Sequence, residues 1–149
     1  MTIVLKDISL KNFSDVGRLA VSDDQTKYVA SNFYSISEAQ FSDAFRPRAV
    51  YWGDTPVGFV MYALVQRLQS PDECDIFRFM IDQNYQGRGL GRKAMELVLG
   101  EIKAMDAVAR ITICYVASNT TARDFYGSFG FVELEQKNPG GEVVAEIRL

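Results

Sequence analysis

The chain has 149 residues, of which 48% are hydrophobic and 23% charged, a composition typical of one globular domain with a substantial core. Sixteen lysines and arginines against nineteen aspartates and glutamates give a formal net charge of -3, which disfavours a nucleic-acid partner and suits a cationic one. The sequence contains no histidine, which excludes histidine-based catalytic triads, histidine metal sites and imidazole proton shuttles. Catalysis must therefore depend on carboxylates, tyrosine, backbone amides or a cofactor, and we expect no metal.

The two cysteines and the first ten residues indicate where the protein works. Cys74 and Cys114 show neither CxxC spacing nor a paired framework, which is typical of reduced intracellular thiols. Residues 1–10 alternate polar and apolar side chains and lack the apolar core of a signal peptide. Apolar runs such as 59–65 are too short to span a bilayer. We therefore expect a soluble cytoplasmic protein with no membrane partner.

The first half of the sequence combines helical and strand-like periodicity. In chain order it predicts a strand at 2–8, helices at 12–21 and 35–45, strands at 48–52 and 57–64, and a polar loop at 66–73. Ser35 or Ser37 is the expected N-cap of the second helix, and the segment 22–34 before it shows no clear period. The turn residues 53–56 join the two later strands as an antiparallel hairpin.

The second half alternates strands with helices before it ends in two strands. It predicts a strand at 75–81, a helix of about four turns from Leu90, a strand at 110–116, a helix capped by Ser118 or Asn119 that ends at Gly130, and strands at 131–135 and 142–149. No repeat or linker divides the chain. Residues 1–149 are therefore expected to form a single domain.

The most informative segment is the glycine-rich run at 85–92, between a predicted strand and a predicted helix. Its three glycines stand at alternate positions and leave successive backbone N–H groups unobstructed, while the helix adds its positive N-terminal end. This turn should bind a phosphate or pyrophosphate, with added charge from Arg88 and Arg92. The alternative is a tight turn whose glycines only satisfy backbone geometry. The spacing fits neither a Rossmann fingerprint nor a Walker loop.

Two motifs in this half of the chain resemble those of the GNAT superfamily of acetyl-CoA-dependent N-acetyltransferases. The first is Phe79-Met80-Ile81 followed by Gln86-Gly87-Arg88-Gly89-Leu90-Gly91. The second comprises Asn119, Ala122, Phe125-Tyr126 and Phe129-Gly130-Phe131. Gly127 departs from the family, which often has a charged or longer residue there. The order of predicted strands and helices agrees with the family over essentially the whole chain.

The resemblance implies an α/β (α+β) fold: one GNAT-like domain around a central mixed, mostly antiparallel sheet of about six to seven strands, flanked by about four helices. The two middle strands would splay apart and hold the pantetheine arm between them. The turn from Gln86 to Arg92, Leu90 included, would bind the CoA pyrophosphate. Backbone N–H groups near Phe79, Met80 and Ile81 would polarise the thioester carbonyl, and Asn119 would contact the cofactor arm or merely cap its helix.

The resemblance also assigns the proton transfers. Tyr126 matches the family tyrosine that protonates the departing CoA thiolate, although it shares a helical face with Phe125 and Phe129 and could simply pack there. Glu73 and Asp75, at the entrance of the central strand, are the candidate bases, with solvated loop acids as the alternative. Strict alternation would place residues 73, 75, 77 and 79 on one face of that strand. Some relatives carry a glutamate where this chain has Phe77, which leaves the base open.

The segment 78–87 resembles most the bacterial spermine/spermidine N-acetyltransferase branch, which implies a small-molecule polyamine acceptor. Acids concentrated in the first half suit such an acceptor: Asp23, Asp24, Glu38, Asp43, Asp54, Asp72, Glu73 and Asp75. Tyr28, Tyr34 and Trp52 could add cation–π contacts. Rival acceptors are an aminoglycoside, another small amine or a protein lysine. A non-catalytic acyl-CoA-binding module and a phosphate-binding regulatory domain are the other classes, and a homodimer is common in the family.

Overall fold

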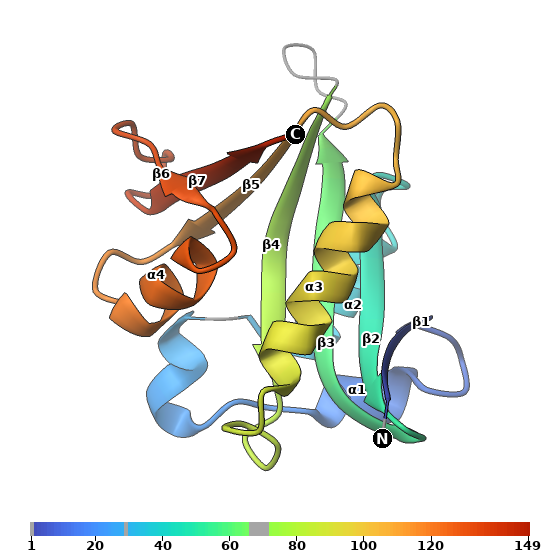
Figure 1. Ribbon diagram of the computed structural model, residues 1–149. Coiled ribbons are helices and arrows are strands. Elements are labelled where there is room, and N and C mark those ends of the chain that lie inside the picture. The colour runs from blue at the N-terminus through green and yellow to red at the C-terminus, as the bar shows by residue number, and fades with distance from the viewer. Residues whose placement is uncertain (1, 29, 66–71) are drawn as a thin grey trace.

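The computed structural model of the protein describes residues 2–28, 30–65 and 72–149 (Figure 1). In chain order its elements are β1 (Ile3–Asp7), α1 (Phe13–Arg18), the 3-10 helix η1 (Asp23–Tyr28), α2 (Asn32–Ala39), β2 (Phe45–Trp52), β3 (Thr55–Val65), β4 (Glu73–Ile81), α3 (Leu90–Lys103), β5 (Arg110–Tyr115), α4 (Thr120–Gly127), β6 (Val132–Glu133) and β7 (Val143–Arg148). The loop predicted at 66–73 lies largely outside the described residues. Within the described part of the chain, no helix is both long and apolar enough to cross a membrane.

The strands form one seven-stranded sheet in the order β1-β2-β3-β4-β5-β7-β6. Neighbouring strands are antiparallel except β4 and β5, which run parallel. Helix α3 crosses one face of the sheet and α1 and α2 lie on the other, while α4 lies beneath β5 and β7 (Figure 1). Side chains of α3 and α4 join one hydrophobic cluster with the middle strands. The expected mixed, mostly antiparallel sheet with flanking helices is confirmed.

The two middle strands separate after a short paired stretch. Residues 73–76 of β4 pair with 110–113 of β5, and beyond Ile76 the edge of β4 that faces β5 has no strand partner in the described chain. Figure 1 shows the two strands diverging from this paired end. An edge of this kind leaves backbone N–H and C=O groups available to a ligand. The expected splay is therefore confirmed.

A β-bulge in β4 overturns the expected alternation of its side chains. The register with β3 shifts at Phe77, because Met61 pairs with Arg78 whereas Tyr62 pairs with Ile76. Before the bulge Ile76 packs in the cluster under α3, and after it Phe79 packs there as well, whereas Phe77 packs on the α1 and α2 side. One extra residue inverts a two-residue period. Residue 79 therefore does not share a face with 73, 75 and 77.

The second helix also differs from its prediction. Helix α2 begins after Ser31, whose hydroxyl oxygen accepts a hydrogen bond from the Tyr34 backbone N–H at 3.1 Å, so Ser31 rather than Ser35 or Ser37 is the N-cap. Ser35 is fully buried inside the helix. The helix ends at Ala39, and Phe45 begins β2 because its ring packs on Phe77 of β4, 5.3 Å between centroids. Tertiary packing thus overrides the helical spacing that predicted 35–45.

Candidate active site

The open edge of β4 leads into a cleft with a volume of about 1030 Å³. Its walls come from the second half of β4, the glycine-rich turn, the end of β5 and the start of α4, with contributions from η1 and the loop between β6 and β7. Most predicted site residues line this cleft: Asp75, Phe79, Met80, Ile81, Gln86, Gly87, Gly89, Leu90, Gly91, Arg92, Asn119 and Tyr126. Glu73 and Arg88 do not line it.

The glycine-rich turn has the backbone geometry that the sequence predicts. Gly87 and Gly89 have φ angles of 78° and 76°, in the left-handed region that residues other than glycine rarely adopt. Gly89 is the N-cap residue of α3, and no side chain caps this helix end. An added Cβ at either glycine would meet no atom within 4 Å, so the turn is open to a ligand. Uncapped N–H groups at a helix N-terminus are suitable donors to a phosphate.

Two polar side chains of the turn, Gln86 and Arg92, hydrogen-bond to neighbouring segments. Gln86 donates from Nε2 to the carbonyl oxygen of Ile81 at 2.8 Å and to Oε1 of Gln25 at 3.0 Å, which ties the turn to the end of β4 and to η1. Arg92 donates to the Ser128 hydroxyl at 2.6 Å. These bonds hold the turn in place before any ligand binds.

Arg88 does not line the cleft and lies against two aromatic rings, Trp52 and the cleft residue Tyr85. Its guanidinium carbon is 5.7 Å from the ring centroid of Trp52 and 5.9 Å from that of Tyr85. Trp52 therefore contacts Arg88 and does not line the cleft, where an acceptor cation was expected to meet it. Tyr34 is 60% exposed and does not line the cleft either, and the side chain of Tyr28 lies outside the described residues.

Tyr126 both packs and lines the cleft. Its ring stacks on Tyr115, with centroids 6.0 Å apart and an interplanar angle of 22°, and meets Phe125 and Phe131 edge to face. Among the described residues no group hydrogen-bonds its hydroxyl, which leaves the phenol available to a ligand. Burial of the ring raises the pKa of Tyr126 above its usual value, so the phenol stays protonated at neutral pH.

Asn119 is the N-cap of α4. Its Oδ1 accepts the backbone N–H of Ala122 at 3.1 Å, so the expected capping contact is present. The residue lines the cleft as well. The side chain of Asn119 therefore has two roles: it caps the helix that carries Tyr126, and it forms part of the cleft wall.

The two candidate bases have different surroundings. Glu73 accepts from Arg110 Nη1 at 2.9 Å and is committed to this ion pair beside the cleft. Asp75 lines the cleft and accepts from the Thr112 hydroxyl at 2.7 Å. Burial raises the pKa of Asp75, the nearby charge of Glu73 raises it further, and the bond from Thr112 opposes the rise. Of the two candidates, Asp75 alone lines the cleft, while Glu73 is paired with Arg110, so the geometry favours Asp75 and its raised pKa suits a proton acceptor.

The structure adds an acid that sequence reasoning missed. Glu142 lines the cleft from the loop between β6 and β7. Asn138 holds it in place: Nδ2 of Asn138 donates to Oε1 of Glu142 at 3.2 Å, and the Glu142 backbone N–H donates to Oδ1 of Asn138 at 2.8 Å. Its charge adds to the raised pKa of Asp75. The acids expected near the acceptor all lie in the first half of the chain, whereas the pairing of β7 with β5 brings this later turn to the cleft. The turn residues Asn138-Pro139-Gly140-Gly141, which directly precede Glu142, were the sequence feature that pointed to a loop at this position.

Two of the eight acids expected around the acceptor line the cleft, Asp24 and Asp75. Glu38 instead lies 3.5 Å from Arg78, in a partly buried ion pair between α2 and β4. With Glu142, the cleft has three carboxylates, and Arg78 and Arg92 are the basic residues in its described lining. No group of three or more potential metal ligands lies together in the described residues.

The structure thus combines a sheet that splays between β4 and β5, an open glycine-rich turn at the free edge of β4, and Tyr126 beside that edge, which is the arrangement that the two motifs imply. Residues 13–131 match the Acetyltransferase (GNAT) family, and the chain belongs to that family. The protein is therefore an acetyltransferase, as the two motifs predict.

Similar proteins agree with this family and with the fold. The spermine/spermidine N(1)-acetyltransferase of Bacillus subtilis (strain 168) is 28% identical over 134 residues, which cover 88% of each chain. The crystal structure of an acetyltransferase from Thermus thermophilus superposes with a TM-score of 0.79 at 21% identity, covering 100% of this chain and 98% of that one. The aminoglycoside acetyltransferase AAC(6')-Ib, solved with coenzyme A, has a TM-score of 0.82 at 13% identity over 99% of this chain and 95% of that one.

Proposed function

We propose that the protein transfers the acetyl group of acetyl-CoA to a primary amine of a small cationic acceptor, a polyamine such as spermidine or spermine. The observation that carries this proposal is one cleft lined both by the open glycine-rich turn, through Gly87, Gly89 and Gly91, and by the carboxylates of Asp24, Asp75 and Glu142. The name of the Bacillus subtilis relative supports the choice of acceptor. Both substrates meet in a ternary complex, and the amine attacks the thioester directly.

The turn from Gln86 to Arg92 binds the CoA diphosphate through backbone N–H groups and the N-terminus of α3. The unpaired edge of β4 at 79–81 takes the pantetheine arm as an added strand. A backbone N–H of this edge stabilises the charge that develops on the thioester oxygen during attack. Asn119 borders the arm on the opposite wall.

Asp75 accepts a proton from the acceptor ammonium, directly or through a water, because only the neutral amine carries a lone pair. The amine nitrogen then bonds to the acetyl carbon and the carbon–sulfur bond breaks. Tyr126 donates its phenolic proton to the departing thiolate, since its raised pKa keeps it protonated until then. The new amide nitrogen still carries one proton too many, and this proton passes through a water to the Tyr126 phenolate, so CoA leaves as the thiol and the net proton released is the one that Asp75 holds. Glu73 contributes through the field that raises the pKa of Asp75.

The remaining ammonium groups of a polyamine bind Glu142 and Asp24. A multiply charged cation gains from several carboxylates that line one cleft, and the gain weakens as salt screens the charges. We also propose that the protein works in the cytoplasm, since Cys74 and Cys114 are free thiols. Assembly as a homodimer is proposed on family grounds alone.

The test is release of CoA thiol from acetyl-CoA with spermidine, spermine, a monoamine, kanamycin and a lysine-containing peptide. We expect the highest kcat/KM for the polyamines, with KM rising as salt increases. Glu142→Gln should raise the KM for spermidine, whereas Glu135→Gln, at an exposed position outside the cleft, should not. If kanamycin or the peptide is acetylated and the polyamines are not, the polyamine acceptor is wrong and acetyl transfer stands.

A further inference from the structure

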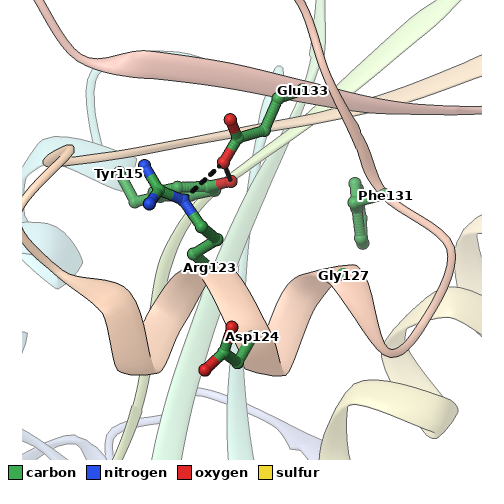
Figure 2. Close-up of a pocket in the computed structure, with 6 residues that line it drawn as sticks. All are labelled: Tyr115, Arg123, Asp124, Gly127, Phe131 and Glu133. Carbon is green, nitrogen blue, oxygen red and sulfur yellow. Dashed lines mark hydrogen bonds and ion pairs between the residues drawn. The ribbon is translucent and has the colours of Figure 1, made fainter.

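A polar cluster lies behind the wall of the cleft that carries Tyr126. In the shallow depression of Figure 2, the carboxylate of Glu133 on β6 accepts two hydrogen bonds. Tyr115 at the end of β5 donates its hydroxyl at 2.7 Å, and Arg123 on α4 donates Nε at 2.8 Å. Three consecutive elements, β5, α4 and β6, therefore meet at one carboxylate.

This cluster connects back to Tyr126 through two routes. The ring of Tyr115, which is 6% exposed, stacks on the ring of Tyr126. Arg123 precedes Tyr126 by three residues in α4, so the two belong to the same short helix. Tyr126 is thus linked to Glu133 in two ways: by ring stacking on Tyr115, which donates to Glu133, and through α4, whose Arg123 also donates to Glu133.

The surroundings explain why α4 depends on such a tether. The helix has eight residues and none of them is fully buried. The neighbouring strand β6 has two residues, and β5 lacks β4 as a neighbour beyond Ile113. The rings of Phe125 and Tyr126 pack α4 against the core, and the bond from Arg123 to Glu133 adds a polar tether that restricts rocking of the helix about these contacts.

We propose that Tyr115 and Glu133 are positioning residues that hold the Tyr126 hydroxyl at the cleft. The inference rests on the proposed role of Tyr126 as general acid. Tyr115 stays a donor because burial and the bond to Glu133 raise its pKa to about 12. The two donors in turn lower the pKa of Glu133, so the carboxylate stays ionised at neutral pH. The anchor is complete wherever the enzyme works near neutrality.

Tyr115→Phe is the decisive variant, since it keeps the stacked ring and removes only the anchored hydroxyl. We expect kcat to fall about three- to tenfold, the effect of one hydrogen bond, with KM for acetyl-CoA and acceptor within about twofold of wild type. Glu133→Ala should act in the same way. Glu135→Ala, which removes an exposed glutamate on the same segment, should leave kcat unchanged.

The double variant with Tyr126→Phe tests whether the effect passes through Tyr126. A positioning residue has nothing left to position there, so Tyr115→Phe should change kcat by less than about twofold in that background. Equal loss in both backgrounds, or loss that follows only the fraction of folded protein, overturns the proposal.

A second readout does not depend on turnover. In protein labelled with fluorotyrosine, the ¹⁹F resonance missing from Tyr126→Phe identifies Tyr126. It should shift or broaden in Glu133→Ala and stay in place in Glu135→Ala. An unmoved resonance in Glu133→Ala overturns the positioning role, whereas absence of acetyl transfer with every acceptor counts against the proposed function alone.

Discussion

Ile76 and Ile113 are the last residues at which β4 and β5 pair, and the cleft opens directly beyond them. The exposed strand edge offers backbone N–H donors, whose presence does not depend on which side chains the strand carries. Under the proposed function this edge supplies the oxyanion contact, which explains how a chain without histidine can catalyse acyl transfer. The remaining chemistry falls to one carboxyl group and one phenol.

Gly89→Asp should weaken acetyl-CoA binding about tenfold or more, because it places a negative charge where the diphosphate is proposed to bind. The variant should fold, since a Cβ at residue 89 has open space around it and aspartate tolerates a positive φ better than most residues. Calorimetry measures the affinity. Gly100→Asp, the same change at an exposed site of α3, is the control. Unchanged affinity in a folded Gly89→Asp would move the diphosphate elsewhere.

This turn could be predicted from sequence because its requirements are local. Gly87 and Gly89 need positive φ, and Asn119 caps the residues directly after it. The bulge at Phe77 could not, because it exists only in the register between β4 and β3. The position of Glu142 in the cleft could not be predicted for the same reason, since it depends on the pairing of β7 with β5. Contacts between distant segments leave no periodic signal in either one.

Tyr126→Phe should lower kcat about a hundredfold, the usual effect of removing a general acid, and leave acetyl-CoA affinity nearly intact. The melting temperature should not fall, because the hydroxyl has no hydrogen-bond partner in the described residues and the ring stays. Steady-state kinetics and thermal unfolding check both expectations. Tyr34→Phe, at a tyrosine that is 60% exposed, provides the control. A wild-type rate in Tyr126→Phe would reduce the residue to packing.

Glu101→Ala should destabilise the fold by about 2 kcal/mol, or roughly 5 °C in melting temperature, without a selective loss of activity. Glu101 on α3 accepts from the hydroxyl of buried Tyr62 and from Arg48 at 2.8 Å. The Arg48 Nε is already buried without a partner in the described chain, so losing Glu101 leaves this guanidinium poorly satisfied. Glu96→Ala, at an exposed position of the same helix, should change stability by less than about 0.5 kcal/mol. Equal melting temperatures for the two variants would contradict the network.

Asp75→Asn should separate activity from stability. The folded protein raises the pKa of Asp75, so this carboxyl contributes most to stability below its unfolded pKa, and the contribution is lost as pH rises through the folded pKa. Asparagine removes that loss and can still accept the Thr112 hydroxyl bond. The variant should therefore melt at a higher temperature than wild type at neutral pH, and the difference should vanish in acid.

The same carboxyl should set the acid limb of the rate. In wild type, kcat/KM should fall as pH drops through the raised pKa of Asp75, because the protonated acid cannot accept the amine proton. Asp75→Asn should lose this limb and lower the plateau about a hundredfold. Glu73→Gln should keep the limb but move it to lower pH, since the charge of Glu73 raises the pKa of Asp75. If Glu73→Gln abolishes the limb and Asp75→Asn retains it, the base is Glu73, and its ion pair with Arg110 must open during each turnover.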